Sequence, residues 1–192
     1  PSAFAQIDLV VLSELGLHNP VAAAIGKAQE SEMALARAVF GRVPPQSLAL
    51  GDRLYGVGKC IAAVIPLWLD QGSHFLFRVR SNLKRRVHKR FRDGSAWVTI
   101  STTDGRRLEV REIVGKLRTR QGKTVEVRLW TSLLDAVLYP AHELLVLYAQ
   151  RWEMELATDE LKNKLHRGHR LKSLTPATAV QELAALVLAQ AV

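Results

Sequence analysis

The segment YAQRWEMELATDELK, residues 148–162, decides the interpretation of this chain. On a helical wheel of about 100° per residue, Tyr148, Arg151, Glu155 and Lys162 share one narrow arc. Apolar side chains flank this polar stripe on both sides, Leu147, Met154, Leu161 and Leu165 on one and Leu145, Trp152 and Leu156 on the other. Because a solvated face would lie opposite the apolar residues, charges placed between them must be paired, bind a metal or face a cleft.

An ordinary ion pair is the simplest alternative explanation of this stripe. Arg151 and Glu155 are spaced i, i+4, and such a pair contributes only a few tenths of a kcal/mol at an exposed site. It accounts for two of the four polar residues and leaves Tyr148 and Lys162 as coincidence.

Upstream of the stripe, the pattern alternates strands and helices. Two strands, Gln6 to Leu12 and Pro20 to Ile25, are predicted to pair across a turn at Gly16 to Asn19. Ser31 is a predicted N-cap for a helix from Glu32 to Phe40. The apolar run Ser47 to Leu50 indicates a buried strand with Asp52 at its C-terminal end, followed by a helix from Gly56 to Gln71 and a strand from His74 to Arg80.

The middle of the chain shows the period-two alternation of an antiparallel β meander. The alternating segments are Ala96 to Ile100, Leu108 to Val114 and Thr124 to Trp130, with turn signals at Asp93-Gly94, Asp104-Gly105 and Gln121-Gly122. A long helix is predicted from His142 to about Leu165, and a last helix with Thr175 as N-cap and Pro176 in its first position. The order predicts an α/β domain interrupted by a small β domain.

The net positive charge of the chain is confined to this middle segment. Residues 78–128 hold 16 basic and 5 acidic side chains, whereas residues 1–77 and 129–192 each have a net charge of −1. The densest part, Arg78 to Arg92, has eight Lys or Arg and no acid. A basic block on one element is typical of a protein that binds a polyanion, although a solvated face or a basic loop gives the same composition.

Tyr148, Arg151, Glu155 and Lys162 match in type and spacing the signature of the insertion-sequence-four family of bacterial DDE transposases, which this chain resembles. The segment Leu48 to Arg53 is similar to the family's strand with the second catalytic Asp, and the segments 171–176 and 180–183 are similar to its closing part. Leu54 stands where the family usually has Gly, so we expect a changed strand-to-helix turn beside Asp52.

The resemblance implies a ribonuclease-H-like core, a mixed sheet flanked by helices, interrupted by a small antiparallel β insertion domain. We predict that residues 1–80 and 136–192 form this core and that residues 81–135 form the basic insertion. A DNA transposase of this kind cleaves phosphodiesters and transfers strands at transposon ends.

The resemblance also implies roles for individual residues. Asp52 and Glu155 are expected to be catalytic ligands of Mg²⁺ or Mn²⁺, two ions in a complete site, because hard ions prefer carboxylate oxygens. Tyr148, Arg151 and Lys162 are expected to position the DNA around the cleaved phosphate. Further DNA contacts are expected from the basic residues Arg53, Arg78, Arg80, Lys84, Arg85, Arg86, Lys89 and Arg90.

Other expectations concern completeness and context. The first catalytic Asp is expected before Gln6, so the chain, which begins at Pro1, is expected to be a catalytically incomplete part of a longer protein; Asp8 is expected to be structural or exposed. Trp97 and Trp130 are each expected to be core residues of the small sheet rather than to stack on a base. Cys60 is expected to be buried. His166 and His169 are expected to be solvated or to face phosphate rather than to bind a metal.

The resemblance implies terminal inverted repeats and target DNA as partners, a DNA-bound homodimer, no membrane association and a bacterial cytoplasmic location. Two alternatives remain open, an inactive transposase-derived DNA-binding module and a related metal-dependent nuclease.

Overall fold

The structure is a computed structural model that describes residues 7–27, 30–118, 122–152, 173 and 175–190. The chain divides into two compact units. One comprises Pro1–Arg42 together with Arg151–Val192, and the other comprises Val43–Gln150.

Among its described residues, the first unit contains a two-stranded antiparallel sheet and two named helices. Its elements are β1 (Ile7–Ser13), β2 (Pro20–Lys27), α1 (Glu32–Phe40) and α5 (Pro176–Gln190). The Ser31 hydroxyl accepts the Ala34 N–H at 3.2 Å, and the Thr175 hydroxyl accepts the Thr178 N–H at 3.2 Å, so both predicted N-caps are confirmed. Asp8 is exposed on β1.

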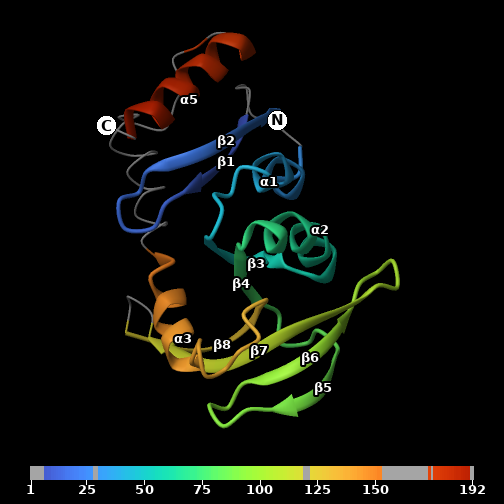
Figure 1. The fold of residues 1–192 in the computed structure, drawn as a ribbon. Coiled ribbons are helices and arrows are strands. Elements are labelled where there is room, and N and C mark those ends of the chain that lie inside the picture. Colours follow the sequence, from blue (N-terminus) through green and yellow to red (C-terminus); the bar gives the residue numbers. More distant parts are fainter. Residues whose placement is uncertain (1–6, 28–29, 119–121, 153–172, 174, 191–192) are drawn as a thin grey trace. The chain divides into compact units, whose positions relative to one another are not determined.

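The second unit is built on one six-stranded mixed sheet (Figure 1). Its strand order is β3-β4-β8-β7-β6-β5, and among the strands that the structure describes in this sheet only the pair β3–β4 is parallel. The elements are β3 (Leu48–Gly56), α2 (Gly58–Trp68), the 3-10 turn η1 (Leu69–Gln71), β4 (His74–Val79), β5 (Arg85–Arg90), β6 (Ala96–Ser101), β7 (Arg107–Arg118), β8 (Thr124–Thr131) and α3 (Ala141–Ala149).

Helices α2 and α3 cover opposite faces of this sheet. Phe77 of β4 lies edge-on to Trp68 of α2, with ring centroids 6.0 Å apart. The neighbouring Leu76 packs with Leu144 and Tyr148 of α3. Because successive strand residues point to opposite faces, these contacts place the two helices on the two sides of β4.

The predicted meander is confirmed. Strands β6, β7 and β8 pair in sequence as antiparallel neighbours, and Gly94 and Gly105 turn between strands with φ of 82°. Strand β8 also pairs with β4, so the meander and the β3–β4 pair form one sheet. The domain boundaries expected at residues 80 and 136 stay a prediction.

Two expectations about individual elements differ from the structure. Strand β5 falls in the basic block and was not predicted, because all six of its residues are exposed and leave no alternating pattern. The helix predicted from His142 to about Leu165 is interrupted, because α3 ends at Ala149, Gln150 and Arg151 form a turn and Trp152 is again helical. The remainder of the predicted helix lies outside the described residues. The Gln150 N–H donates to the Leu147 carbonyl, three residues earlier, which tightens the last turn of α3. No Gly or Pro in the sequence marks this helix end.

Candidate active site and DNA-binding surface

Asp52 lies where β3 leaves its regular pairing with β4. The last regular pair is Gly51 with Phe77, and the next is Gly56 with Val79, so β3 advances five residues while β4 advances two. The half-buried Asp52 carboxylate accepts the Leu54 N–H at 2.8 Å within this irregular stretch. Asp52 is therefore not at the end of a short strand, as predicted, but inside a longer, locally distorted one, a common feature beside active sites.

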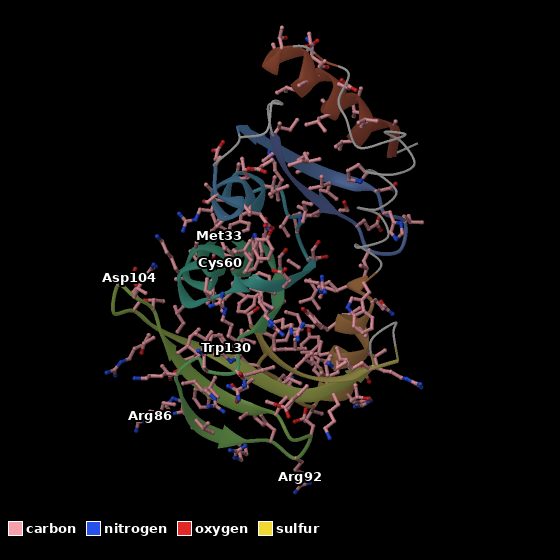
Figure 2. All side chains as sticks on the ribbon, turned by 180° about the vertical axis from the view of Figure 1, so that it is seen from behind. Met33, Cys60, Arg86, Arg92, Asp104 and Trp130 are labelled. Atoms are coloured by element: carbon pink, nitrogen blue, oxygen red, sulfur yellow. The ribbon has the colours of Figure 1, made fainter. Side chains whose placement is uncertain are left out.

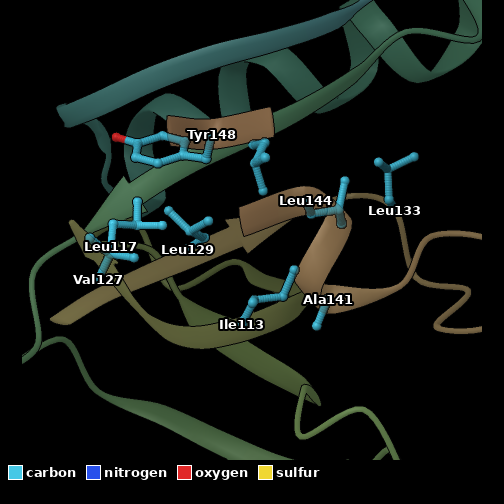
Figure 3. Packing of buried hydrophobic residues seen from close by; sticks show 9 residues of the cluster. Ile113, Leu117, Val127, Leu129, Leu133, Ala141, Leu144 and Tyr148 are labelled. Carbon is cyan, nitrogen blue, oxygen red and sulfur yellow. The ribbon is translucent and has the colours of Figure 1, made fainter. Parts of the chain in front are cut away.

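Tyr148 connects helix α3 to the strand that carries Asp52. Its side chain is 3% exposed and packs among Leu117, Leu129 and Leu144 (Figure 3). Its hydroxyl donates a hydrogen bond to the Gly51 carbonyl, 3.3 Å away. The first residue of the signature thus contacts the residue next to Asp52, although the two are 97 positions apart in the chain.

Of the other three signature residues, the structure describes only Arg151. Arg151 is half-buried in the turn after α3 and belongs to the first compact unit. Glu155 and Lys162 lie outside the described residues, as do His166 and His169. Of the predicted metal ligands, the described residues include only Asp52.

The described residues contain no group of three His, Cys, Asp or Glu side chains that could hold a metal ion. Asp52 itself suits a hard divalent ion by chemistry, since it offers carboxylate oxygens at a distorted strand. Glu155 would add a second carboxylate of the same kind.

The residues of the predicted basic DNA-binding set lie on both sides of the sheet, with Arg53 on β3, Arg78 and Arg80 on or just after β4, and the other five on or beside β5. Arg53 and Arg80 are exposed and Arg78 is half-buried, whereas Lys84, Arg85, Arg86, Lys89 and Arg90 are exposed on or beside β5. Figure 2 shows Arg86 and Arg92 at the β5 side of the sheet and Trp130 inside the unit. Trp130 is 2% exposed, which confirms it as a core residue.

Glu112 anchors one of these basic side chains. Its buried carboxylate accepts the Arg85 Nε–H at 2.9 Å and the Trp130 indole N–H at 3.2 Å. Such a paired acid holds the Arg85 stem against the sheet. The pairing was not predicted because it joins β5 to β7 across β6.

Arg111 is a second buried charge that the sequence pattern did not reveal. Its side chain is fully buried, and it donates to the Asp93 carboxylate at 2.5 Å, the Ser95 hydroxyl at 2.8 Å and the Tyr139 carbonyl at 2.7 Å. Asp93 also accepts the N–H of Ala141, the first residue of α3. This cluster ties the β5–β6 turn, β7 and the start of α3 together.

The Arg111 cluster shifts the pKa of its acid. Burial by itself raises the pKa of Asp93, but hydrogen bonds from Ser95 and Ala141 and the nearby Arg111 charge lower it more. The net effect is a lowered pKa, so Asp93 is ionised at neutral pH and compensates the buried guanidinium. Burial also lowers the pKa of Arg111, against the opposing effect of Asp93.

Cys60 is 1% exposed, as predicted for a buried thiol. Among the helices that the structure describes, none combines the length and the hydropathy needed to cross a bilayer.

The similarity to known proteins extends over nearly the whole chain. The family described as "Transposase DDE domain" matches residues 2–191. The chain is 28% identical over 197 aligned positions to the transposase InsG for insertion sequence element IS4 of Escherichia coli (strain K12). The alignment covers 98% of this chain and 43% of that relative, so the chain spans less than half the length of the protein it resembles.

Proposed function

Because this chain belongs to the transposase DDE-domain family, with the signature of the IS4 type, we propose that it forms the catalytic domain of a DNA transposase. Its reaction is metal-dependent phosphodiester cleavage and strand transfer at transposon ends. The observation that carries this proposal is the contact between the signature residue Tyr148 and Gly51, which fixes helix α3 beside the Asp52 strand.

The fold of this domain is proposed to be a ribonuclease-H-like core of residues 1–80 and 136–192 with a basic β insertion of residues 81–135. The parallel β3–β4 pair with helices on both faces supports such a core, and the antiparallel strands β5–β8 support the insertion. Asp52 lies on β3, before the insertion, and Glu155 follows it in the chain.

Asp52 and Glu155 are the proposed carboxylate ligands of two Mg²⁺ or Mn²⁺ ions. When bound, such ions supply charge stabilisation and an activated oxygen nucleophile. The contribution of the chain is to hold Asp52 in place, through the Leu54 N–H bond and through the Tyr148 hydroxyl on the preceding carbonyl.

DNA is the proposed substrate, both as terminal inverted repeats and as target. Arg151 and Lys162 are proposed to hold phosphates near the cleavage site, together with the exposed Arg53 beside Asp52. Two transposon ends must be joined, so we propose that the DNA-bound protein is a homodimer.

The decisive experiment uses the full-length protein that contains this sequence. It is incubated with a labelled duplex ending in the terminal repeat of its own locus and with Mg²⁺ or Mn²⁺. Asp52→Asn and Glu155→Gln are expected to abolish cleavage and to retain DNA binding. Asp70→Asn is the matched control, because Asp70 is an exposed acid of the same unit on η1.

Cleavage that survives Glu155→Gln would falsify the assigned role of the signature. Binding without cleavage under either metal would favour the second candidate, an inactive DNA-binding module, which the confinement of charge to residues 78–128 also supports. Cleavage without strand transfer would favour a related nuclease.

A further inference from the structure

An open pocket of about 300 Å³ lies on the β5–β6 side of the sheet in the second unit. Its walls are cationic, formed by Lys84, Arg85, Arg86, His88 and Arg107. The hydroxyl groups of Thr99 and Ser101 also line it. Of these residues, Arg107, His88, Thr99 and Ser101 lie outside the set expected from the sequence to contact DNA.

Register explains why these side chains gather. Arg86 lies directly opposite Thr99 across the β5–β6 pair, and Ser101 lies opposite Arg107 across the β6–β7 pair. Because residues directly opposite each other point to the same face, three neighbouring strands present cations and hydroxyls side by side.

The charge of the pocket is unbalanced. No carboxylate lines it, and Glu109, opposite Thr99 on β7, is the nearest acid by register. Arg85 lies opposite Ile100, so its guanidinium points to the other face of the sheet, where Glu112 balances its charge. The other three Lys or Arg side chains, Lys84, Arg86 and Arg107, lie close together and repel one another, and an anion relieves that repulsion. Arginine forks and hydroxyl donors together match the oxygens of a phosphate group.

One wall of the pocket is held in place before any ligand binds. The His88 ring lies 2.5 Å from the Thr99 hydroxyl through Nε2, and its centroid is 5.3 Å from that of Trp97. A site whose side chains are already ordered loses less entropy on binding.

The pocket and Asp52 lie at opposite edges of the same sheet. Strand β5 is five positions from β3 in the strand order, which at the usual spacing between neighbouring strands is about 24 Å across the sheet. The pocket also lies farther along the strands, because the level of Gly51 runs through Phe77, Trp130 and Glu112 to Ala96, whereas Thr99 and Ser101 follow Ala96 on β6. The pocket is therefore several base pairs of duplex DNA away from Asp52.

We propose that this pocket, centred on Arg86 and Arg107, binds one backbone phosphate of duplex DNA several base pairs from the phosphate that is cleaved near Asp52. The location relative to the cleaved phosphate rests on the proposed transposase function. Phosphate binding by the pocket itself does not. The contact reads no base and instead fixes the path of the duplex across the sheet.

The first test is binding of a random-sequence duplex, measured by fluorescence anisotropy at several salt concentrations. Arg86→Ala combined with Arg107→Ala is expected to weaken binding roughly tenfold or more at physiological salt and to reduce the log–log salt slope by about two. The control pair Lys116→Ala and Arg118→Ala removes the same charge from exposed positions of β7 outside the pocket. Equal losses in both pairs would overturn the proposal, because net charge alone would then explain binding.

A neutral variant separates a built phosphate site from a merely basic surface. Ser101→Ala removes one hydroxyl donor and no charge. Affinity is expected to fall severalfold while the salt slope stays unchanged, because no counterion release is lost. Unchanged affinity would contradict a hydrogen-bonded phosphate in the pocket. All variants are exposed on the strand surface, and a thermal unfolding curve checks each fold.

The second test locates the phosphate. Single methylphosphonate substitutions, which remove one backbone charge each, are placed along the terminal-repeat duplex. The full-length wild-type protein is expected to be sensitive at a phosphate several base pairs from the cleavage site, and the Arg86→Ala, Arg107→Ala variant to be insensitive there. Sensitivity that persists in the variant overturns the proposal even if cleavage still requires Asp52. If the pocket variants weaken DNA binding but the wild-type protein never cleaves DNA, the transposase function is contradicted and phosphate binding by the pocket is not.

Discussion

Tyr148 brings a polar group into the otherwise apolar packing between α3 and the sheet. The ring contributes to the core, and the hydroxyl satisfies the buried Gly51 carbonyl beside Asp52. The same residue was expected to contact DNA. Its burial supports a role in positioning the Asp52 strand, and substitution distinguishes the two roles.

Tyr148→Phe is expected to lower the free energy of unfolding by about 1 kcal/mol, because a buried carbonyl loses its donor. It is also expected to slow DNA cleavage while leaving DNA affinity unchanged. Urea unfolding, cleavage assays and anisotropy measure the three quantities. A large loss of DNA affinity at unchanged stability would instead support direct contact with DNA.

The Arg111 cluster makes a prediction about pH. Since the pKa of Asp93 is lower in the folded protein than in the unfolded chain, the stability it contributes is present above the unfolded pKa of about 3.9. That contribution is lost as the pH falls through the lower folded value. The free energy of unfolding, measured against pH, should therefore decrease below about pH 4.

Asp93→Asn is expected to destabilise the protein at neutral pH and to flatten this acid dependence, because the fully buried Arg111 loses its countercharge. Asp104→Asn serves as the control. The pKa of Asp104 is lowered to about 2, chiefly by its bond with Arg106, but both side chains are about half exposed, and we expect little effect on stability. Equal losses of stability in the two variants would argue against a stabilising role of the Arg111–Asp93 pair.

At the scale of elements, strand β5 shows how a sheet edge can be both protected and functional. All six of its residues are exposed, and four of them are Lys or Arg. Charge along an edge strand discourages pairing with the edge of another sheet. The same side chains supply part of the wall of the pocket.

The distortion of β3 depends on a glycine. A Cβ at Gly56 would lie 1.8 Å from the Arg78 carbonyl oxygen, a backbone atom that cannot move without shifting β4. Gly56→Ala is therefore expected to destabilise the protein by about 2 kcal/mol or more. Because Gly56 closes the irregular stretch that holds Asp52, cleavage should fall as well.

Thermal unfolding and cleavage assays test this prediction. The control is Gly41→Ala, since a Cβ there meets nothing within 4 Å and the backbone is right-handed with φ of −72°. Similar stability of the two variants would show that β3 and β4 can separate without cost.

At the scale of the whole molecule, charge is divided unequally between the two compact units. Residues 43–150 contain 18 Lys or Arg and 9 Asp or Glu, whereas the remaining residues contain 9 of each. The net charge of +9 therefore belongs to one unit. Such a concentration attracts DNA independently of its sequence.

Binding to random-sequence duplex is accordingly expected to depend steeply on salt. If six or more phosphates are engaged, affinity should fall about a thousandfold between roughly 50 and 200 mM salt. Anisotropy titrations measure this slope. A nearly flat slope would contradict DNA binding by the basic unit.

Much of the fold could be predicted from local pattern. The helix of residues 32–40 with its Ser31 cap, the β1–β2 hairpin and the β6–β8 meander follow from capping residues, turn glycines and alternation, all of which act between near neighbours. Strand β5 and the end of α3 at Ala149 could not be predicted. Their limits depend on pairing with β6 and on a tightened last turn rather than on residue type.

By itself, the sequence determined the family, through four residues at set spacing, and the segment that carries the charge. Only the tertiary structure decided what surrounds those residues. The Tyr148–Gly51 bond, the Arg111–Asp93 pair and the pocket on β5 and β6 all join positions far apart in the chain. Such contacts leave no periodic signal, because they depend on strand register, which emerges only when the sheet is assembled.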